Sequence, residues 1–507
     1  MPDLPNPLIP GFNPDPSCVL VDGTYYLVTS TFEYLPGLPV YRSTDFVTWE
    51  HIGNVATREE QVGLARATSA AGVWAPTIRH HKGRFHVIVS VTDSPRGCVV
   101  FTADDPAGPW SDGVTVTGIT GIDPDLAWDE SGAAYVTYSA LELDGVEPVG
   151  FHGIRQARVD LAAGKVLEKP RSLWSGIGLV APEAPHLYRR DGYWYLLIAE
   201  GGTSHGHSVS VARSRSIEGP FEGAPHNPVL REAGWDHPVE CTGHADLVRG
   251  PDGDDLLVLL GTRRAGHGSP LGRETYVTGV QWRDGWPQPA HVGLDPRPEP
   301  VAEDFDFTEG ADLSDPGWLA VGRPPAEVAS VSEQPGRLTI EAAAEGGLDA
   351  FRPAFVGRRQ RHLNSTFETR IDPADGRGGL GLRFTEDFTL CLVAERAPSG
   401  TGTKVTARVG IPTISQSWST EVAGDQVTLR LSTRVPQRGR APWFPPGDRV
   451  RLTVVDDAGG ETELAEVDGR FWSVETSATF TGRVIGMFAE EGTVRFAGFR
   501  YRGEGGS

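Results

Sequence analysis

The chain has 507 residues, more than one ordinary hydrophobic core accommodates, so we expect two large domains or three small ones. Its 63 glycines and 40 prolines are typical of many short strands joined by turns, which predicts an all-β protein. The formal net charge of −21 repels phosphate backbones and anionic lipid headgroups, so it argues against nucleic acid and membranes as partners and is compatible with a neutral sugar.

The N-terminal segment, Met-Pro-Asp-Leu-Pro-Asn-Pro, has neither the basic region nor the apolar run of a secretion signal. No apolar stretch long enough to span a membrane follows. We therefore expect a cytoplasmic protein. The four cysteines are widely spaced and show no Cys-x-x-Cys pattern, which predicts free thiols rather than disulfides or zinc ligands. They are Cys18, Cys98, Cys241 and Cys391.

Five segments in the first 300 residues repeat one pattern, in which a turn that ends in glycine is followed by an apolar, β-prone run. Successive turn glycines are 60, 49, 60 and 61 residues apart, which leaves room for about four strands in each repeat. Turn pairs such as Asp-Gly tolerate positive φ, so each repeat is predicted to begin with a β-hairpin. The turn glycines are Gly23, Gly83, Gly132, Gly192 and Gly253.

A chemically distinctive residue precedes each turn glycine by eight or nine positions. These residues are Asp15, Trp74, Asp123, Glu183 and His244. If the repeats are blades of a five-bladed β-propeller, equivalent positions on the innermost strands converge on the central axis and share one cavity. A single carboxylate near a turn is usually a solvated loop residue. Three acids in the same frame, each beside a proline, favour a functional cluster instead.

Three acids without an obvious metal-binding set indicate proton transfer. Cleavage of a glycosidic bond needs one protonated and one ionised carboxyl group. A third acid nearby raises the pKa of the proton donor, because negative charges disfavour its ionisation. Asp125 and Asp129 lie beside Asp123 and compete for this third role, but only Asp123 fits the repeat frame.

A metal site is the alternative suggested by Ser-His-Gly-His. Alternation along a strand would place His205 and His207 on one face, where both could bind a metal ion. No third ligand is apparent, so we predict no metal site and no required cofactor.

Six motifs occur in a fixed order along the first 300 residues. They are Gly-Phe-Asn-Pro-Asp-Pro-Ser at 11–17, Thr-Phe-Glu-Tyr-Leu-Pro-Gly at 31–37, Gly-Val-Trp-Ala-Pro at 72–76, Gly-Ile-Asp-Pro-Asp-Leu at 121–126, Pro-Glu-Ala-Pro-His-Leu-Tyr at 182–188 and Gly-Arg-Glu-Thr at 272–275. This set resembles glycoside hydrolase family 43, and its β-xylosidase branch most of all.

The resemblance implies roles for the three acids. Asp15 would be the general base that activates water, Glu183 the general acid, and Asp123 the residue that raises the pKa of the acid and orients it. Inversion is then expected, with the Asp15 and Glu183 carboxyl groups roughly 6.5–9.5 Å apart to leave space for a water molecule.

The resemblance also implies a sugar-binding set. Phe32 and Trp74 would line the sugar pocket, because aromatic faces suit the apolar face of a pyranose. Arg273 and Thr203 would contact sugar hydroxyls. His244 would line the axial channel, either beside a calcium ion or its waters or as a hydrogen-bonded structural imidazole.

The repeat stops at a proline-rich acidic stretch near 295–305. We therefore divide the chain into a five-bladed β-propeller catalytic domain at 1–298 and a β-sandwich domain at 303–507. The resemblance implies a concanavalin-like sandwich that packs against the propeller and helps to close the pocket. Its β-rich segments lie at 337–341, 426–431, 449–455 and 484–488.

The leading hypothesis is an inverting exo-acting β-1,4-xylosidase that releases xylose from xylo-oligosaccharides. An α-L-arabinofuranosidase, or an enzyme with both activities, remains the rival, because the three acids do not distinguish the two sugars. A different class is a carbohydrate-binding propeller without turnover. Neutral pentose-containing oligosaccharides are the expected partners in each case, and the sequence indicates no oligomeric state.

Overall fold

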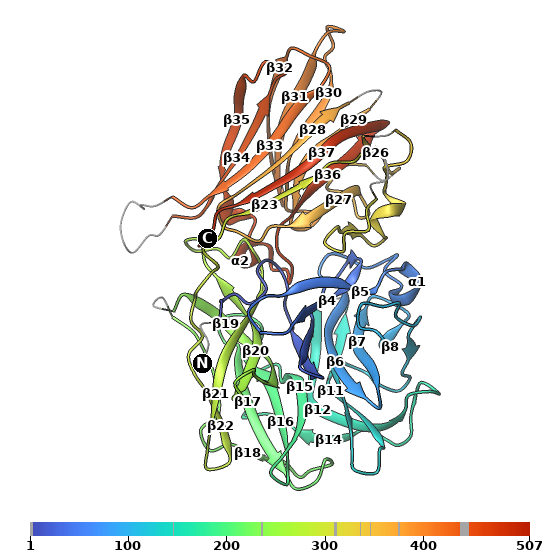
Figure 1. Ribbon diagram of the computed structural model, residues 1–507, viewed down its shortest axis with the longest axis vertical. Helices are drawn as coiled ribbons and strands as arrows, with labels where there is room; N and C mark the ends of the chain where they lie inside the picture. Colours follow the sequence, from blue (N-terminus) through green and yellow to red (C-terminus); the bar gives the residue numbers. More distant parts are fainter. Residues whose placement is uncertain are drawn as a thin grey trace.

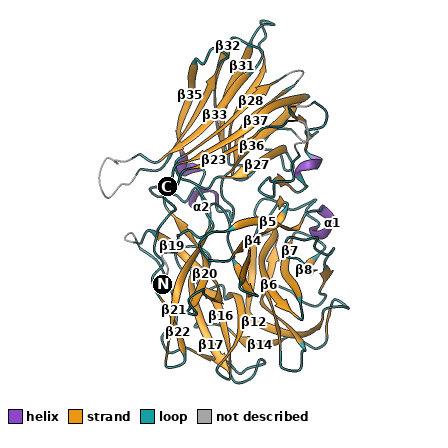
Figure 2. Cartoon of the chain, viewed as in Figure 1, coloured by secondary structure: helices purple, strands orange, loops and turns teal. Residues whose placement is uncertain are grey.

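The computed structural model describes residues 4–144, 147–234, 237–308, 312–334, 336–344, 346–373, 376–436 and 446–507. Two β-rich domains lie end to end, and the C-terminus lies near their junction (Figure 1). Strands make up most of both domains, and the described helices are short (Figure 2). The prediction of an all-β protein is confirmed.

Five antiparallel sheets make up the described part of the N-terminal domain. The first two contain β1 (Ser17–Val21), β2 (Thr24–Val28), β4 (Gly37–Ser43) and β5 (Glu50–Ala56), then β6 (Gly72–His81), β7 (Arg84–Thr92), β8 (Gly97–Ala103) and β9 (Val114–Thr115). The third contains β10 (Ile122–Trp128), β11 (Ala134–Asp144), β12 (Glu147–Asp160), β13 (Lys165–Val166) and β14 (Arg171–Trp174). The last two contain β15 (Glu183–Arg190), β16 (Tyr193–Glu200), β17 (Ser208–Ser214) and β18 (Glu222–Gly223), then β19 (Val239–Arg249), β20 (Asp255–Arg263), β21 (Glu274–Arg283) and β22 (Trp286–Pro289).

Each sheet begins with the predicted hairpin. The first two strands of every sheet pair antiparallel across a turn that contains one of the five predicted glycines. All five glycines have φ between 78° and 83°, the left-handed region that glycine enters without steric cost. The spacing of the glycines thus identified the start of every sheet correctly.

The five sheets are arranged in a closed ring. Their first strands neighbour one another in the order β1, β6, β10, β15 and β19, and β19 returns to β1. A separate buried apolar cluster lies between each pair of successive sheets, including one between the fifth sheet and the first. Burying a single large apolar side chain contributes roughly 1.5–3 kcal/mol, so these clusters hold the sheets together around a common centre.

Two larger sheets form the described part of the C-terminal domain. One has the order β25-β26-β37-β28-β33-β34-β35 with β23 also on β37, and the other has the order β27-β36-β29-β30-β31-β32. The first comprises β23 (Val301–Phe305), β25 (Ala329–Ser330), β26 (Leu338–Glu341), β28 (Ser365–Asp372), β33 (Val427–Arg434), β34 (Arg449–Val455), β35 (Glu461–Asp468) and β37 (Thr493–Gly503). The second comprises β27 (Ala354–Arg359), β29 (Arg377–Arg383), β30 (Thr389–Arg396), β31 (Thr403–Ile411), β32 (Ile414–Val422) and β36 (Val484–Glu491).

Both large sheets contribute side chains to one shared core, such as Phe367 and Leu429 from the first and Leu380 and Leu392 from the second. Buried and partly exposed residues alternate along β28 and β33, as expected for strands with one face on a core. The four β-rich segments predicted in this half all coincide with strands: β26, β33, β34 and β36.

Short elements complete the chain and connect the domains. β3 (Tyr34–Leu35) of the N-terminal domain pairs with β24 (Ala320–Val321) of the C-terminal domain. The short helices are α1 (Glu59–Val62), η1 (Pro325–Glu327), η2 (Gly469–Phe471) and α2 (Val474–Ser477). Among the described residues, no helix has the length and apolar character needed to cross a membrane. The four cysteines are buried free thiols, as predicted.

Candidate active site

The backbone is irregular where the first strands of the sheets begin. In or just before the first strand of each sheet, at least one non-glycine residue has φ between 45° and 56°, and β6, β10, β15 and β19 shift register near these residues. These residues include Asp15, Ala75, Asp123, Ala184 and, in β19, both Cys241 and His244. Left-handed non-glycine residues and β-bulges are strained features that often mark functional sites. In the second and fourth sheets the left-handed residue follows the predicted Trp74 and Glu183 by one position, so the predicted equivalence is approximate there.

Asp15 is buried, with only 5% of its surface exposed. The Ser30 hydroxyl donates a hydrogen bond of 2.6 Å to Asp15 Oδ2, and Arg273 Nη1 lies 3.4 Å from Asp15 Oδ1. His244 Nδ1 lies 3.5 Å from the same Oδ1. Burial alone would raise the pKa of Asp15, but the Arg273 charge and the Ser30 hydrogen bond hold that pKa below its usual value. Asp15 is therefore ionised at neutral pH.

Asp123 and Glu183 have the opposite electrostatic environment. Asp123 Oδ2 accepts a hydrogen bond of 3.0 Å from the backbone N–H of Ala184, so Asp123 is held against the segment that carries Glu183. Burial and the charge of Asp15 raise the pKa of Asp123 to about 7. Burial, then the charges of Asp123 and Asp15, raise the pKa of Glu183 well above its usual value. The site therefore combines Asp15, which ionises readily, with Glu183, which keeps its proton to higher pH than an ordinary glutamic acid.

His207 contacts this acid, although the sequence suggested a different role for it. Its side chain is buried, and burial lowers its pKa to about 4, so the imidazole is neutral. Nδ1 lies 3.0 Å from the Cys241 carbonyl oxygen, which only an N–H can satisfy, so Nε2 carries a lone pair. Nε2 lies 3.7 Å from Glu183 Oε1 and has no hydrogen-bond partner among the described residues. A lone pair facing the carboxyl group disfavours its ionised form.

The prediction that His205 and His207 share one face of a strand is wrong. Both precede β17, which begins at Ser208, and the chain turns between them. The His205 side chain is 70% exposed and lies 3.9 Å from Glu240, whereas His207 points inward. Because the alternation of a strand does not apply in a turn, the pair offers no shared metal site.

Arg273 lies beside Asp15 and links it to the rest of the predicted sugar-binding set. Its Nη1 donates a hydrogen bond of 2.9 Å to Thr203 Oγ1, as expected if both residues face one pocket. The guanidinium carbon lies 5.6 Å from the centre of the Phe32 ring. Arg273 also donates to the backbone oxygen of Phe480, at 3.4 Å from Nε and 3.3 Å from Nη2.

Phe480 was not predicted from the sequence, and it comes from the C-terminal domain. Its ring centre lies 5.3 Å from Trp74 in an edge-on arrangement and 6.0 Å from Phe32. Trp74 is fixed in turn by a hydrogen bond of 2.7 Å from Nε1 to the Ala70 carbonyl. The C-terminal domain therefore completes an aromatic wall, which confirms that it packs against the site.

The carboxylates near His244 are engaged in ion pairs. The nearby carboxylates of Asp125 and Asp246 are already paired with Arg79, at 2.7 Å and 3.0 Å. Because its carboxylate is bound to Arg79, Asp125 is a weaker candidate than Asp123 for the predicted third role. Asp129 lies apart from the site, where Oδ1 accepts from the Ser131 and Ala133 backbone N–H groups in a turn.

A cluster with metal-ligand chemistry lies elsewhere. Glu232, His237 and His291 offer ligand atoms within 4.8 Å of one another, and among the described residues they are the one such group of three or more. Glu232 is buried and lies 2.9 Å from His237 Nδ1 and 3.0 Å from His291 Nδ1. Both imidazoles therefore lie against the carboxylate of Glu232.

Comparisons with known proteins show which family the chain belongs to. The sequence model for "Glycosyl hydrolases family 43" matches residues 4–287, and that for "Beta xylosidase C-terminal Concanavalin A-like domain" matches residues 304–502. A non-reducing end α-L-arabinofuranosidase of Bacteroides ovatus is 37% identical over 390 residues, which cover 72% of this chain and 70% of that protein. A xylan 1,3-β-xylosidase of Vibrio sp is 32% identical and covers 90% of this chain and 93% of its own.

Solved structures are similar over nearly the whole chain. The xylan β-1,4-xylosidase of Bacillus halodurans superimposes with a TM-score of 0.86 at 26% identity, covering 98% of this chain and 100% of that one. The C-terminal domain is thus of the concanavalin-like type. With the paired acids of the N-terminal domain, these matches show that the chain belongs to glycoside hydrolase family 43, as a glycoside hydrolase of the β-xylosidase and arabinofuranosidase type.

Proposed function

We propose that the protein is an inverting exo-β-1,4-xylosidase that releases xylose from xylo-oligosaccharides. The observation that carries the proposal is that two carboxyl groups of one buried cluster have pKa values shifted in opposite directions. Asp15 has a lowered pKa, whereas Glu183 has a raised one, and such a separation assigns the base and the acid.

The mechanism follows from these protonation states. Ionised Asp15 removes a proton from a water molecule, which attacks the anomeric carbon on the face opposite the leaving group. Glu183 donates its proton to the leaving oxygen in the same step. Asp123 favours the protonated form of Glu183 through its charge and is fixed by the Ala184 N–H. Arg273 and Thr203 are placed to bind sugar hydroxyls beside Asp15.

We also infer the architecture that supports this site. The closed order of the five first strands and the apolar cluster between every pair of successive sheets support a five-bladed propeller. The shared core of the two large sheets supports a β-sandwich. Asp15, Asp123 and Glu183 then lie on innermost strands or beside them, at the centre of the ring.

An α-L-arabinofuranosidase is the second candidate, because relatives of similar identity carry both names. The Bacteroides ovatus relative is an arabinofuranosidase, and a Butyrivibrio fibrisolvens relative that is 36% identical is a xylosidase/arabinosidase. We would follow the anomeric proton NMR signals during hydrolysis of xylobiose and of an arabinose-substituted xylo-oligosaccharide. Early α-xylose from xylobiose supports the proposal. Release of arabinose alone favours the second candidate, and early β-xylose contradicts inversion.

Replacing Asp123 by asparagine is expected to shift the alkaline limb of the pH–activity profile to lower pH. Activity is lost on the alkaline side as Glu183 releases its proton, and the Asp123 charge raises the pKa of Glu183. Without that charge, Glu183 ionises at lower pH, and kcat/KM at neutral pH falls by about 10²-fold. The profile of kcat/KM on xylobiose measures the shift. Asp129→Asn, the same change in an exposed turn, should leave the profile unchanged; an unshifted limb in Asp123→Asn would contradict the role.

Phe480→Ala is expected to lower kcat/KM by about 10–100-fold, because losing the contact area of one large aromatic side chain costs roughly 1.5–3 kcal/mol. The ring lies against Trp74 and Phe32, so its loss opens the wall of the sugar pocket. Steady-state kinetics on xylobiose test this expectation. Phe471→Ala, which removes a partly exposed ring from the same domain, is the matched control. Equal effects of the two substitutions would show that Phe480 contributes only to stability.

A further inference from the structure

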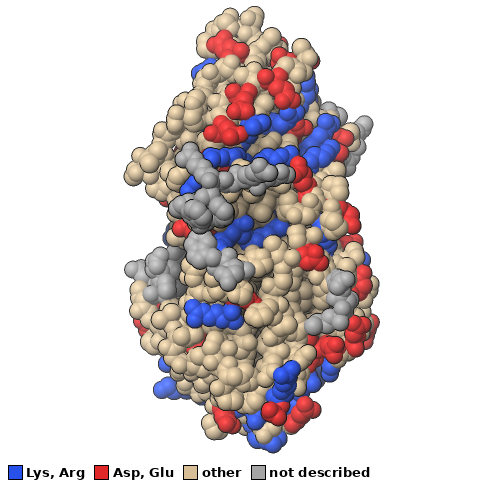
Figure 3. Space-filling view, turned by 90° about the vertical axis from the view of Figure 1, so that its left-hand side faces the viewer, with Lys and Arg blue, Asp and Glu red and all other residues tan. Residues whose placement is uncertain are grey.

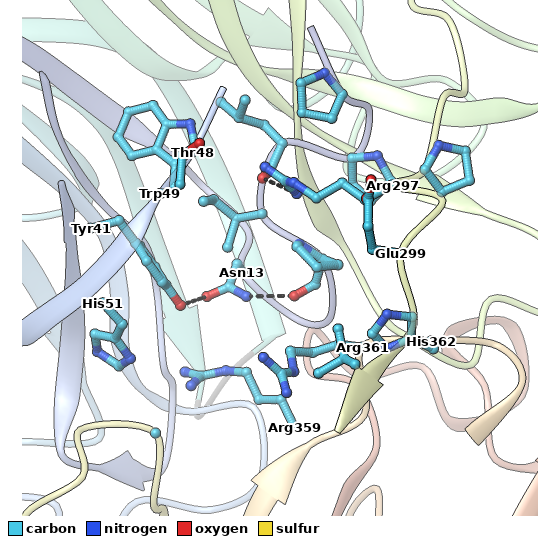
Figure 4. A pocket seen from close by; sticks show the side chains of 18 of the residues that line it. Asn13, Tyr41, Thr48, Trp49, His51, Arg297, Glu299, Arg359, Arg361 and His362 are labelled. Atoms are coloured by element: carbon cyan, nitrogen blue, oxygen red, sulfur yellow. Dashed lines mark hydrogen bonds between the residues drawn. The ribbon is translucent and has the colours of Figure 1, made fainter. Parts of the chain in front are cut away.

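A second cavity lies between the two domains, outside the site described above. It has a volume of about 820 Å³, within the range of small-molecule sites. The N-terminal segment, β4 and β5 line one side, and residues 358–362 of the C-terminal domain line the other. Figure 4 shows Arg359 and Arg361 opposite Asn13 and Tyr41. On one face of the molecule, basic side chains gather at the waist between the domains (Figure 3).

Arg359 is the distinctive residue of this cavity. It is only 7% exposed, and its guanidinium carbon lies 4.6 Å from the centre of the Phe12 ring. Nε donates to the Phe12 carbonyl oxygen at 2.9 Å, but Nη2 is buried without a hydrogen-bond partner among the described residues. No carboxylate of the described chain lies within ion-pair distance of Arg359. This guanidinium therefore lacks a counter-ion, and burying an unpaired charge is strongly unfavourable.

The neighbouring arginines, in contrast to Arg359, each have a carboxylate as counter-ion. Arg358 pairs with Asp315 at 2.6 Å, and Arg361 pairs with Glu303 at 2.7 Å. Arg359 therefore lies in a basic environment whose carboxylates are already engaged. Burial, then the positive charge of Arg359, lowers the pKa of His51 to about 4, so this imidazole adds no charge of its own.

Acidic groups also line the cavity, on its other side. Asp295 and Glu299 belong to the segment between the domains, and Glu299 lies near Arg297 rather than near Arg359 (Figure 4). Arg297 donates to the backbone oxygens of Leu8 and Val47, at 3.2 Å and 2.7 Å. The positive potential is thus local to Arg359, and the net charge of −21 does not cancel it at contact distance.

We propose that this cavity binds a small organic anion whose carboxylate or phosphate group pairs with Arg359. The planar guanidinium favours such groups because it donates two parallel hydrogen bonds to them. The cavity is far larger than an inorganic ion and has aromatic side chains, Tyr41 and Trp49, on its wall. A sugar-sized molecule with one acidic group, such as a uronic acid or a sugar phosphate, fits both features.

The cavity is connected to the catalytic base through a short segment. Asn13 forms part of its wall and accepts a hydrogen bond of 2.8 Å from the Tyr41 hydroxyl. Asn13 precedes Asp15 by two residues, and Arg359 holds the carbonyl of Phe12. A bound anion would therefore stabilise the contact between the domains and the segment that carries Asp15.

Thermal unfolding of the full chain and calorimetric titration test the proposal. The probes are glucuronate, glucose 6-phosphate and inorganic phosphate, with glucose as the neutral control and excess xylose present to fill the catalytic pocket. A ligand that binds the folded state raises Tm, by an amount that grows with its concentration. We expect glucuronate or glucose 6-phosphate to raise Tm and to release heat, and glucose to do neither.

The response also identifies the source of the anion. Binding of glucuronate alone indicates a carboxylate ligand, and binding of glucose 6-phosphate alone indicates a phosphate ligand. A response to neither anion, or an equal response to glucose, would overturn the proposal. Inorganic phosphate distinguishes recognition of the acidic group from recognition of the whole molecule, and we expect it to bind more weakly than the sugar-sized anions.

Two variants connect the response to Arg359. Arg359→Gln should reduce anion affinity by at least about 10-fold, because it removes the charge that strengthens the hydrogen bonds to the anion. Arg451→Gln, an exposed arginine far along the chain, is the matched control. If Arg359→Gln does not fold, His51→Glu tests the same point, because it places a carboxylate beside Arg359. That variant should be more stable without ligand and should lose the anion response; an unchanged response would refute the site.

Discussion

Glu183→Gln is expected to abolish hydrolysis of xylobiose while sparing much of the activity on aryl xylosides with activated leaving groups. A departing sugar hydroxyl needs a proton, and a general acid typically contributes about 10²–10⁴-fold to such a step. Glutamine has nearly the same shape but cannot donate that proton. A phenol with a low pKa leaves without one, so its hydrolysis should depend little on the residue.

The measurement is kcat/KM for xylobiose and for a series of aryl xylosides whose leaving groups differ in pKa. The slope of log kcat/KM against leaving-group pKa should become steeper in the variant. Its alkaline limb should also disappear, since the raised pKa of Glu183 sets that limb. Glu222→Gln, an exposed acid on β18 of the same sheet, is the control. An equal loss of kcat/KM on all substrates would show that Glu183 is not the general acid.

Much of the N-terminal domain could be predicted from the sequence, because the residues that form its hairpin turns are close together in the chain and recur in every repeat. A hairpin turn requires left-handed residues, and each turn glycine, such as Gly23 or Gly253, reports this requirement directly. The same frame located Asp15, Asp123 and, within one residue, Glu183. Because the three acids occupy equivalent positions in the repeat, they were predicted to form one cluster. The structure places them together.

Other parts of the site depend on contacts between distant segments and leave no local pattern. Phe480 reaches Trp74 across the domain boundary, from a segment without any repeat. His207 faces Glu183 only because the chain turns before β17, which the assumption of a regular strand missed. Arg359 lacks a counter-ion because the fold pairs the neighbouring carboxylates with other arginines. Amino-acid composition alone does not reveal such a property. Tertiary packing decides each of these three cases.

Asp15→Asn is expected to inactivate the enzyme toward every leaving group. Attack by water requires removal of a proton whatever group departs, so an activated phenol should give no rescue. The loss should be at least about 10²–10⁴-fold in kcat, the usual contribution of a general base. Asparagine keeps the size of the side chain and can still accept the Ser30 hydrogen bond, so the fold should persist. Asp22→Asn, in the turn of the same hairpin, is the matched control.

An anionic nucleophile separates loss of the base from general damage to the site. Azide needs no deprotonation, and with Asp15 neutralised it no longer meets a carboxylate beside Arg273. Azide should therefore restore turnover of an activated aryl β-xyloside by Asp15→Asn and give the α-xylosyl azide, the product of a single inversion. A β-configured azide, or strong activity of the variant with water alone, would instead assign Asp15 a role other than the base. Because Glu183 remains intact in this variant, the configuration of the product reports on the face of attack alone.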